Sequence, residues 1–153
     1  MTALTQETAA AEGCRDFLIM TVGGQLLGIP TLQVHDVQRG AGVTGIPSAP
    51  LGIAGVMNVR GRVVPVIDLR HRLQLPAVPA GPQTMQIIVQ YGLEAYALVV
   101  DSVGEVLSLP DRDFNRELAA IAPSWREPAL GFYPVKEQQL VILDVPRLLN
   151  SLM

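Results

Sequence analysis

Short apolar runs separated by glycine and proline dominate the chain from Phe17 onward, which is typical of β-strands. No stretch shows the sustained apolar stripe of a helix of three or more turns. The pattern therefore predicts a mostly β fold. The expected strands are 17–22, 25–29, 43–46, 53–59, 63–69, 85–91, 94–100, 103–109, 131–135 and 139–143.

Two of the remaining segments indicate short helices, and a third, 31–37, is ambiguous. Residues 31–37 fit neither the helical nor the strand period, and the polar residues 111–121 favour a helix. Asp144 precedes a Leu-rich tail, where its carboxylate is placed to cap a C-terminal helix over 144–152. Short helices are therefore expected beside the strands, including one at the C-terminus.

The two halves of the chain resemble each other in the order of their elements. Residues 17–30 and 85–100 both read as strand, glycine turn, strand, and each half ends in an apolar strand that runs into an aspartate, Asp68 or Asp144. This similarity indicates an internal duplication of about 70 residues. Because halves of that size are marginal alone, they are expected to pack against one another as two small barrels.

These signals predict a single domain over residues 16–153 that follows a flexible tail, 1–15. The first barrel is expected to span approximately 16–76 and the second approximately 85–143. Residues 77–84, rich in proline and glycine, are expected to link them.

Composition narrows the function classes. The chain is 49% hydrophobic and 16% charged, which supplies enough apolar surface for a core and excludes a disordered chain. Its net charge of −3 argues against nucleic acid as a partner. No segment has the pattern of a signal peptide or a membrane span, so a cytoplasmic protein without membrane insertion is expected.

Motifs for catalysis or cofactor binding are absent from the sequence, with no phosphate loop, dinucleotide motif or nucleophile elbow. Cys14 has no second cysteine to pair with, and His35 and His71 have no neighbours that would complete a metal site. No cofactor and no metal are therefore expected. A small β-barrel ligand carrier or enzyme stays open as an alternative, with Asp101, Asp144 and His35 as its available titrating residues.

The segment 55–70 stands out from the rest of the chain. A turn containing Asn58 and Gly61 joins two apolar strands, with Arg60 just before the glycine. A guanidinium close to apolar surface needs a carboxylate partner, and Asp36 is the candidate. A solvated turn position for Arg60 is equally compatible with the sequence.

This segment, Gly55-Val-Met-Asn58-Val-Arg60-Gly61-Arg62-Val-Val-Pro65-Val-Ile-Asp68-Leu69-Arg70, resembles the signature of the CheW-type chemotaxis coupling proteins, shared with the regulatory domain of CheA histidine kinases. The resemblance extends from Asp16 to Asn150. It implies two packed, five-stranded SH3-like β-barrels. It also implies a non-enzymatic adaptor that couples chemoreceptors to a CheA-type histidine kinase in bacterial chemotaxis signal transduction.

The resemblance further implies two binding surfaces. The helical tip of a methyl-accepting chemoreceptor is expected in a groove between the barrels, at Val34, Asp36, Arg60, Val103 and Val106. The regulatory domain of the kinase is expected on the first barrel, at Ile53, Gly55, Met57 and Gly61. Plain core packing is the competing interpretation for the apolar residues in both sets. The family usually has glutamate where Asp36 stands, so the reach to Arg60 is shorter here.

An adaptor of this kind is expected in the cytoplasm, recruited to membrane-associated receptor arrays. An adaptor of another chemosensory array, such as one that governs surface motility, fits the sequence equally well. The ligand carrier or enzyme remains the alternative from a different class.

Overall fold

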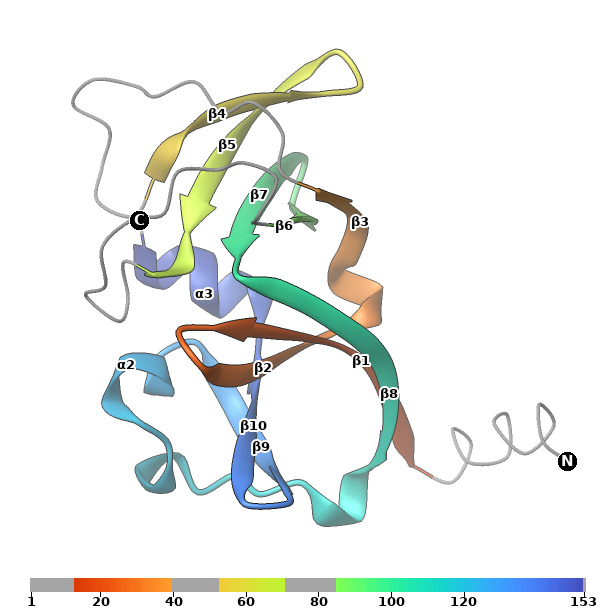
Figure 1. Ribbon diagram of the computed structural model, residues 1–153, viewed down its shortest axis with the longest axis vertical. Helices are drawn as coiled ribbons and strands as arrows, with labels where there is room; N and C mark the ends of the chain where they lie inside the picture. The colour runs from red at the N-terminus through yellow and green to blue at the C-terminus, as the bar shows by residue number, and fades with distance from the viewer. Residues whose placement is uncertain (1–12, 40–52, 71–84, 153) are drawn as a thin grey trace, which may run out of the picture.

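The computed structural model describes residues 13–39, 53–70 and 85–152, which form ten strands and several short helices (Figure 1). The strands are β1 (Cys14–Val22), β2 (Gln25–Pro30), β3 (Val34–Arg39), β4 (Ile53–Val59), β5 (Arg62–Asp68), β6 (Met85–Tyr91), β7 (Glu94–Val100), β8 (Ser102–Pro110), β9 (Ala129–Val135) and β10 (Gln138–Leu143). The helices are η1 (Thr31–Gln33), η3 (Asp111–Asp113), η4 (Leu118–Ala120), α2 (Pro123–Arg126) and α3 (Val145–Leu152).

The strands form two five-stranded sheets, so the predicted mostly β fold is confirmed. The order is β8-β1-β2-β10-β9 in the first sheet and β3-β6-β7-β5-β4 in the second. The expected strand 43–46 and the linker 77–84 lie outside the described residues. β1 begins at Cys14, so the end of the expected tail, 1–15, already belongs to a strand.

The helix expected over 111–121 is wrong. Two short 3₁₀ turns, η3 and η4, flank Asn115, which forms an isolated bridge with Phe132 of β9. The Asn115 N–H donates to the Phe132 carbonyl at 2.9 Å, and the Phe132 N–H donates to the Asn115 carbonyl at 2.8 Å. This pairing outweighs local helix propensity and ties the chain after β8 to the far edge of the first sheet.

Each sheet combines strands from both halves of the chain. The β1–β2 hairpin joins β8, β9 and β10, and the β6–β7 hairpin joins β3, β4 and β5 (Figure 1). The expected barrel boundaries, 16–76 and 85–143, are therefore wrong, because the two halves have exchanged their first hairpins. Two parallel pairings, β2 with β10 and β5 with β7, join each hairpin to the strands of the other half.

The structure nevertheless repeats itself in the way that a duplication predicts. Matching the strands by their place in each half gives both sheets the same order. β4 and β9 each carry a glycine as third residue, Gly55 and Gly131, with φ of 158° and 159°. The turns that follow begin at Arg60 and Lys136, with φ of 52° and 55°.

The protein has three apolar cores, and a single strand can contribute side chains to two of them. We call the cluster between the sheets the central core, with Leu18, Met20, Val22, Ile87 and Val89 among its buried members. The first-sheet core is Phe17, Ile19, Tyr133, Leu140 and Ile142, and the second-sheet core is Met57, Val59, Val64, Val66, Ile88, Ala97 and Val99. Successive residues of one strand alternate between these cores, which explains the unbroken apolar runs in the sequence.

Asp144 caps α3, as the sequence predicts. Its carboxylate Oδ2 accepts a hydrogen bond from the Arg147 N–H at 3.2 Å, and its carbonyl accepts one from the Leu148 N–H at 2.9 Å. The cap fixes the start of a helix whose Leu148 and Leu149 are buried in the central core.

Tyr133 gives the fold an alkaline sensitivity. Burial raises the pKa of Tyr133 above its ordinary value of 10.0, and the negative charge of Asp111 raises it further. Because the unfolded chain ionises first, the free energy of unfolding is expected to fall as the pH rises above 10. Urea denaturation at about pH 8 and about pH 10.5 should show a smaller fall for Tyr133→Phe than for the wild type. Burial also raises the pKa of Tyr96, so the Tyr133→Phe variant should still lose some stability over this pH range. Equal falls in the variant and the wild type would contradict the prediction.

Candidate binding surfaces

The turn between β4 and β5 holds Arg60 in a fixed direction. Arg60 and Gly61 form a two-residue turn with φ of 52° and 85°, as a type I′ hairpin requires. The Asn58 side chain supports this turn, because its Oδ1 accepts a hydrogen bond from the Gly61 N–H at 2.8 Å. The turn that the sequence predicts around Asn58 and Gly61 is thus present, and these two residues are in direct contact.

Arg60 pairs with Asp36, which settles the question that the sequence left open. Arg60 Nη2 donates to Asp36 Oδ2 at 3.1 Å. Asp36 lies on β3 and Arg60 follows β4, and these strands are the two ends of the second sheet. The ion pair therefore bridges the two edges of that sheet.

The pair is accessible to a partner. Asp36 Oδ1 also accepts a hydrogen bond from the Val37 N–H at 2.8 Å, which orients the carboxylate. The Arg60 side chain is 73% exposed and that of Asp36 is 29% exposed. An ion pair with this exposure contributes only about 0–1 kcal/mol to stability, so its removal leaves the fold intact.

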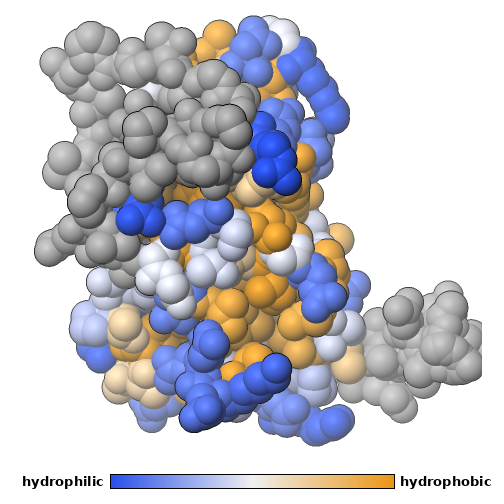
Figure 2. All heavy atoms as spheres, viewed as in Figure 1, coloured by the Kyte–Doolittle hydropathy of each residue, from blue (hydrophilic) through white to orange (hydrophobic). Residues whose placement is uncertain are grey.

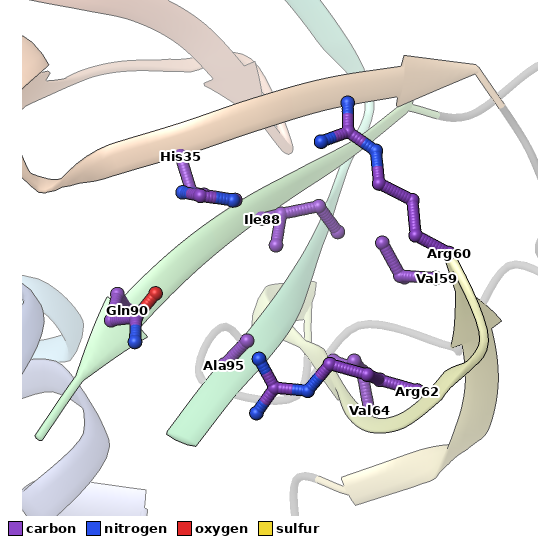
Figure 3. A pocket seen from close by; sticks show the side chains of 8 residues that line it. All are labelled: His35, Val59, Arg60, Arg62, Val64, Ile88, Gln90 and Ala95. Atoms are coloured by element: carbon purple, nitrogen blue, oxygen red, sulfur yellow. The ribbon is translucent and has the colours of Figure 1, made fainter. Parts of the chain in front are cut away.

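A cavity of about 180 Å³ opens beside this pair (Figure 3). It is lined by His35, Val59, Arg60, Arg62, Val64, Ile88, Gln90 and Ala95. Its floor belongs to the second-sheet core, and its rim carries two arginines. Figure 3 shows Arg60 extending toward β3 and Arg62 extending toward β7. An apolar floor beneath guanidinium groups favours an acidic partner over a basic one.

Val103 and Val106 share one face of β8. Residues three apart on a regular strand point to opposite faces. Here the register between β1 and β8 shifts between Leu18 and Met20, so Val106 pairs with Leu18 and Val103 with Met20. Both partners belong to the central core. This bulge therefore turns both valines toward the junction of the two sheets.

The same geometry recurs on β3. Val34 pairs with Val89 and Val37 pairs with Ile87, both in the central core, and the register again shifts just after Val34. Sequence reasoning missed Val37. The Val-x-x-Val spacing shared by 34–37 and 103–106 is the signal that could have found it.

The valines of these two edge strands border the same central core, and we call them together the apolar waist: Val34, Val37, Val103 and Val106. The first three are partly buried against the central core, and Val106 is 53% exposed. β3 and β8 are edge strands of different sheets, so the apolar waist draws on both. Figure 2 shows apolar surface across the junction of the sheets, between hydrophilic regions.

The charged pair and the apolar waist occupy different faces of β3. Asp36 pairs with Ile88 of the second-sheet core, whereas Val34 pairs with Val89 of the central core. The structure therefore places the candidate valines on two edge strands that border the same central core. It places Asp36 and Arg60 on a neighbouring surface, where their ion pair joins the two edges of the second sheet.

The residues expected at the kinase surface differ in accessibility. Met57 is 3% exposed in the second-sheet core, and Gly55 is also buried. Ile53 pairs with Ile67 in β4, and Gly61 is exposed in the turn. The accessible part of this hairpin is therefore its tip, where sequence reasoning missed the exposed Val63.

The residues available to a carrier or enzyme are dispersed. Asp101 is hydrogen-bonded to Arg70, Asp144 caps α3, and only His35 lines the cavity. Among the described residues, no group of three His, Cys, Asp or Glu side chains could hold a metal ion. The described part of the chain also contains no helix long and apolar enough to cross a membrane.

Comparison with known proteins identifies the family. The model of the CheW-like domain matches residues 16–153. The chain belongs to the CheW-like family. The chemotaxis protein CheW of Klebsiella aerogenes is 33% identical over 137 residues, covering 90% of this chain and 82% of that protein. The chemotaxis protein CheW of Rhizobium meliloti is 25% identical and covers 91% of this chain and 90% of that protein.

The CheW-like fold is also found by structural comparison. The crystal structure of the scaffolding protein TtCheW from Thermoanaerobacter tengcongensis matches with a TM-score of 0.74 at 24% identity. The match covers 84% of this chain and 88% of that one. The protein is therefore a CheW-type, non-enzymatic scaffold of chemotaxis signal transduction, as the signature in 55–70 predicts.

Proposed function

We propose that this CheW-type scaffold is an adaptor that joins the cytoplasmic tip of a chemoreceptor to the regulatory domain of a CheA-type histidine kinase. The apolar waist carries the proposal. Its four valines come from the edge strands of two sheets and offer one apolar surface to the face of a helix. The Arg60–Asp36 pair lies beside it, where polar contacts would fix the register of the bound helix.

The kinase domain would bind the β4–β5 hairpin. Gly61 is exposed at its tip, Gly55 and Met57 are buried in β4, and Ile53 begins the same strand. The valines of the apolar waist lie on β3 and β8, so a kinase domain bound at the β4–β5 hairpin would leave them free for the receptor tip. Such an adaptor would work in the cytoplasm at membrane-associated receptor arrays, where several modest interfaces reinforce one another.

Calorimetric titration with a soluble receptor-tip fragment and, separately, with a kinase regulatory domain tests the proposal. Saturable binding to both supports a bridging adaptor. Binding to the kinase domain alone would contradict coupling to receptors. Binding to neither by a well-folded sample would contradict the proposal altogether and favour the ligand carrier.

Arg60→Ala is expected to weaken receptor-tip binding about fivefold to tenfold, because it removes an exposed charge beside the apolar waist. The free energy of unfolding should change by less than about 1 kcal/mol. Arg62→Ala is the matched control, since it removes the same side chain two residues away at the cavity rim. Calorimetry and urea denaturation of both variants check the prediction. Unfolding of Arg60→Ala, or equal binding losses in the two variants, would contradict it.

A further inference from the structure

The chain crosses between the two sheets at two points, and each crossing adjoins the apolar waist. η1 leads from β2 in the first sheet to β3 in the second, and Val34 directly follows it. Asp101 leads back from β7 to β8, and Val103 lies two residues beyond it. The position of each valine therefore depends on how its crossing is held.

Asp101 is bonded to both sheets. Its Oδ2 accepts a hydrogen bond from the Gly23 N–H in the β1–β2 turn at 2.8 Å. Arg70, which follows β5 in the second sheet, donates from Nη1 to both carboxylate oxygens at 3.0 Å. The Asp101 N–H donates to the Thr21 carbonyl at 3.0 Å. Figure 1 shows the end of β5, the β7–β8 corner and the β1–β2 turn converging.

The charges of Asp101 and Arg70 are well placed to hold the β7–β8 corner in position. The Arg70 side chain is mostly shielded from water, and charge-assisted hydrogen bonds there are stronger than those of an exposed pair. The backbone N–H of Arg70 also donates to the buried Asp68 at 3.0 Å, which fixes the position of the Arg70 backbone.

The other crossing has its own polar anchor. Gln33 Nε2 donates to Asp144 Oδ1 at 3.1 Å, and Gln33 Oε1 accepts a hydrogen bond from the Val145 N–H at 3.0 Å. Gln33 thus ties η1 to the start of α3, whose leucines pack in the central core. With this side anchored, the Asp101 cluster governs the opposite side of the apolar waist.

We infer that Asp101 and Arg70 are positioning residues for the apolar waist, which set where Val103 lies relative to Val34. β8 is an edge strand that pairs only with β1 among the described strands. Its first residues therefore depend on the corner that precedes them. The consequence for receptor binding rests on the proposed function, but the effect on β8 does not.

Amide hydrogen exchange of the full chain, followed residue by residue by NMR, tests the positioning without a partner. Asp101→Ala should accelerate exchange at Gly23 and at the first residues of β8 about tenfold or more, with a smaller effect toward Leu109. Asp111→Ala is the matched control, because Asp111 pairs with Arg15 at 3.3 Å beside the opposite end of β8. Arg70→Gln should reproduce the effect and serves if Asp101→Ala does not fold.

Calorimetry then separates positioning from general destabilisation. A positioning role predicts that Asp101→Ala weakens receptor-tip binding about fivefold while binding of the kinase domain is unchanged. Unchanged exchange at β8, or equal loss of both partners, would overturn the inference. If exchange at β8 responds but the wild-type chain binds no receptor tip, the proposed function fails and the positioning of Val103 stands.

Discussion

Val106→Asp should weaken binding of a chemoreceptor tip more than tenfold without unfolding the protein. Val106 is half exposed on the apolar waist, so the free chain keeps the new carboxylate in water. A helix docked on the apolar waist would bury that charge without a partner. The free-energy cost of this burial is several times the free energy that an exposed contact contributes. Calorimetric titration with the receptor-tip fragment measures the loss.

Leu93→Asp is the control for this variant. Leu93 is 92% exposed in the β6–β7 turn, is not one of the four residues of the apolar waist, and receives the same new charge. We expect it to bind the receptor tip like the wild type, and both variants to bind the kinase domain normally. Wild-type affinity in Val106→Asp, or equal losses in both variants, would exclude the apolar waist as the receptor site.

Gly131→Ala should destabilise the fold by about 3 kcal/mol, the upper part of the usual range for overpacking. A Cβ at this buried position would overlap the Asn115 carbonyl oxygen and lie 2.6 Å from Cζ of Phe114. The same backbone segment forms the bridge that ties the chain after β8 to β9. The new methyl group must therefore displace Asn115 and disturb its bridge to β9. Urea denaturation of the purified variant measures the change.

Gly104→Ala provides the comparison within the same sheet. Its Cβ would lie 3.5 Å from the Ile19 carbonyl oxygen, an ordinary van der Waals contact. We expect a change in the free energy of unfolding of at most about 0.5 kcal/mol. Similar losses in both variants would show that strand glycines matter here for a reason other than crowding at Asn115.

The local elements could be predicted from the sequence because their signals are local. The glycine turns at Gly23-Gly24 and Gly92 separate strands of the expected lengths, and Asp144 caps α3 as its position suggests. The prediction of a helix over 111–121 is wrong because the polar composition of this segment reflects local propensity alone. Its structure is decided by the pairing of Asn115 with a strand that follows it in the chain.

The exchange of hairpins could not be predicted in the same way. Strands buried on both faces show no alternation that would tell which sheet they join. The decisive pairings, β2 with β10 and β5 with β7, join residues far apart in the sequence. A repeated order of elements is compatible with two consecutive barrels and with two exchanged ones.

The candidate site was predicted unevenly for the same reason. The Asn58–Gly61 turn is local and visible, but the pairing of Arg60 with Asp36 depends on closure of a sheet across 24 residues. Val103 and Val106 come together only because of a bulge, which no local pattern in β8 announces.

The exchanged hairpins also constrain how the protein can be made. During synthesis β1 and β2 leave the ribosome first, whereas β9 and β10, which complete their sheet, leave last. The earliest strands must therefore wait, with both apolar faces uncovered, until nearly the whole chain has emerged. Such long-range pairing slows folding and exposes the nascent chain to aggregation. We expect the first sheet to form only after β9 and β10 have been synthesised, and the nascent chain to depend on chaperones in the interval.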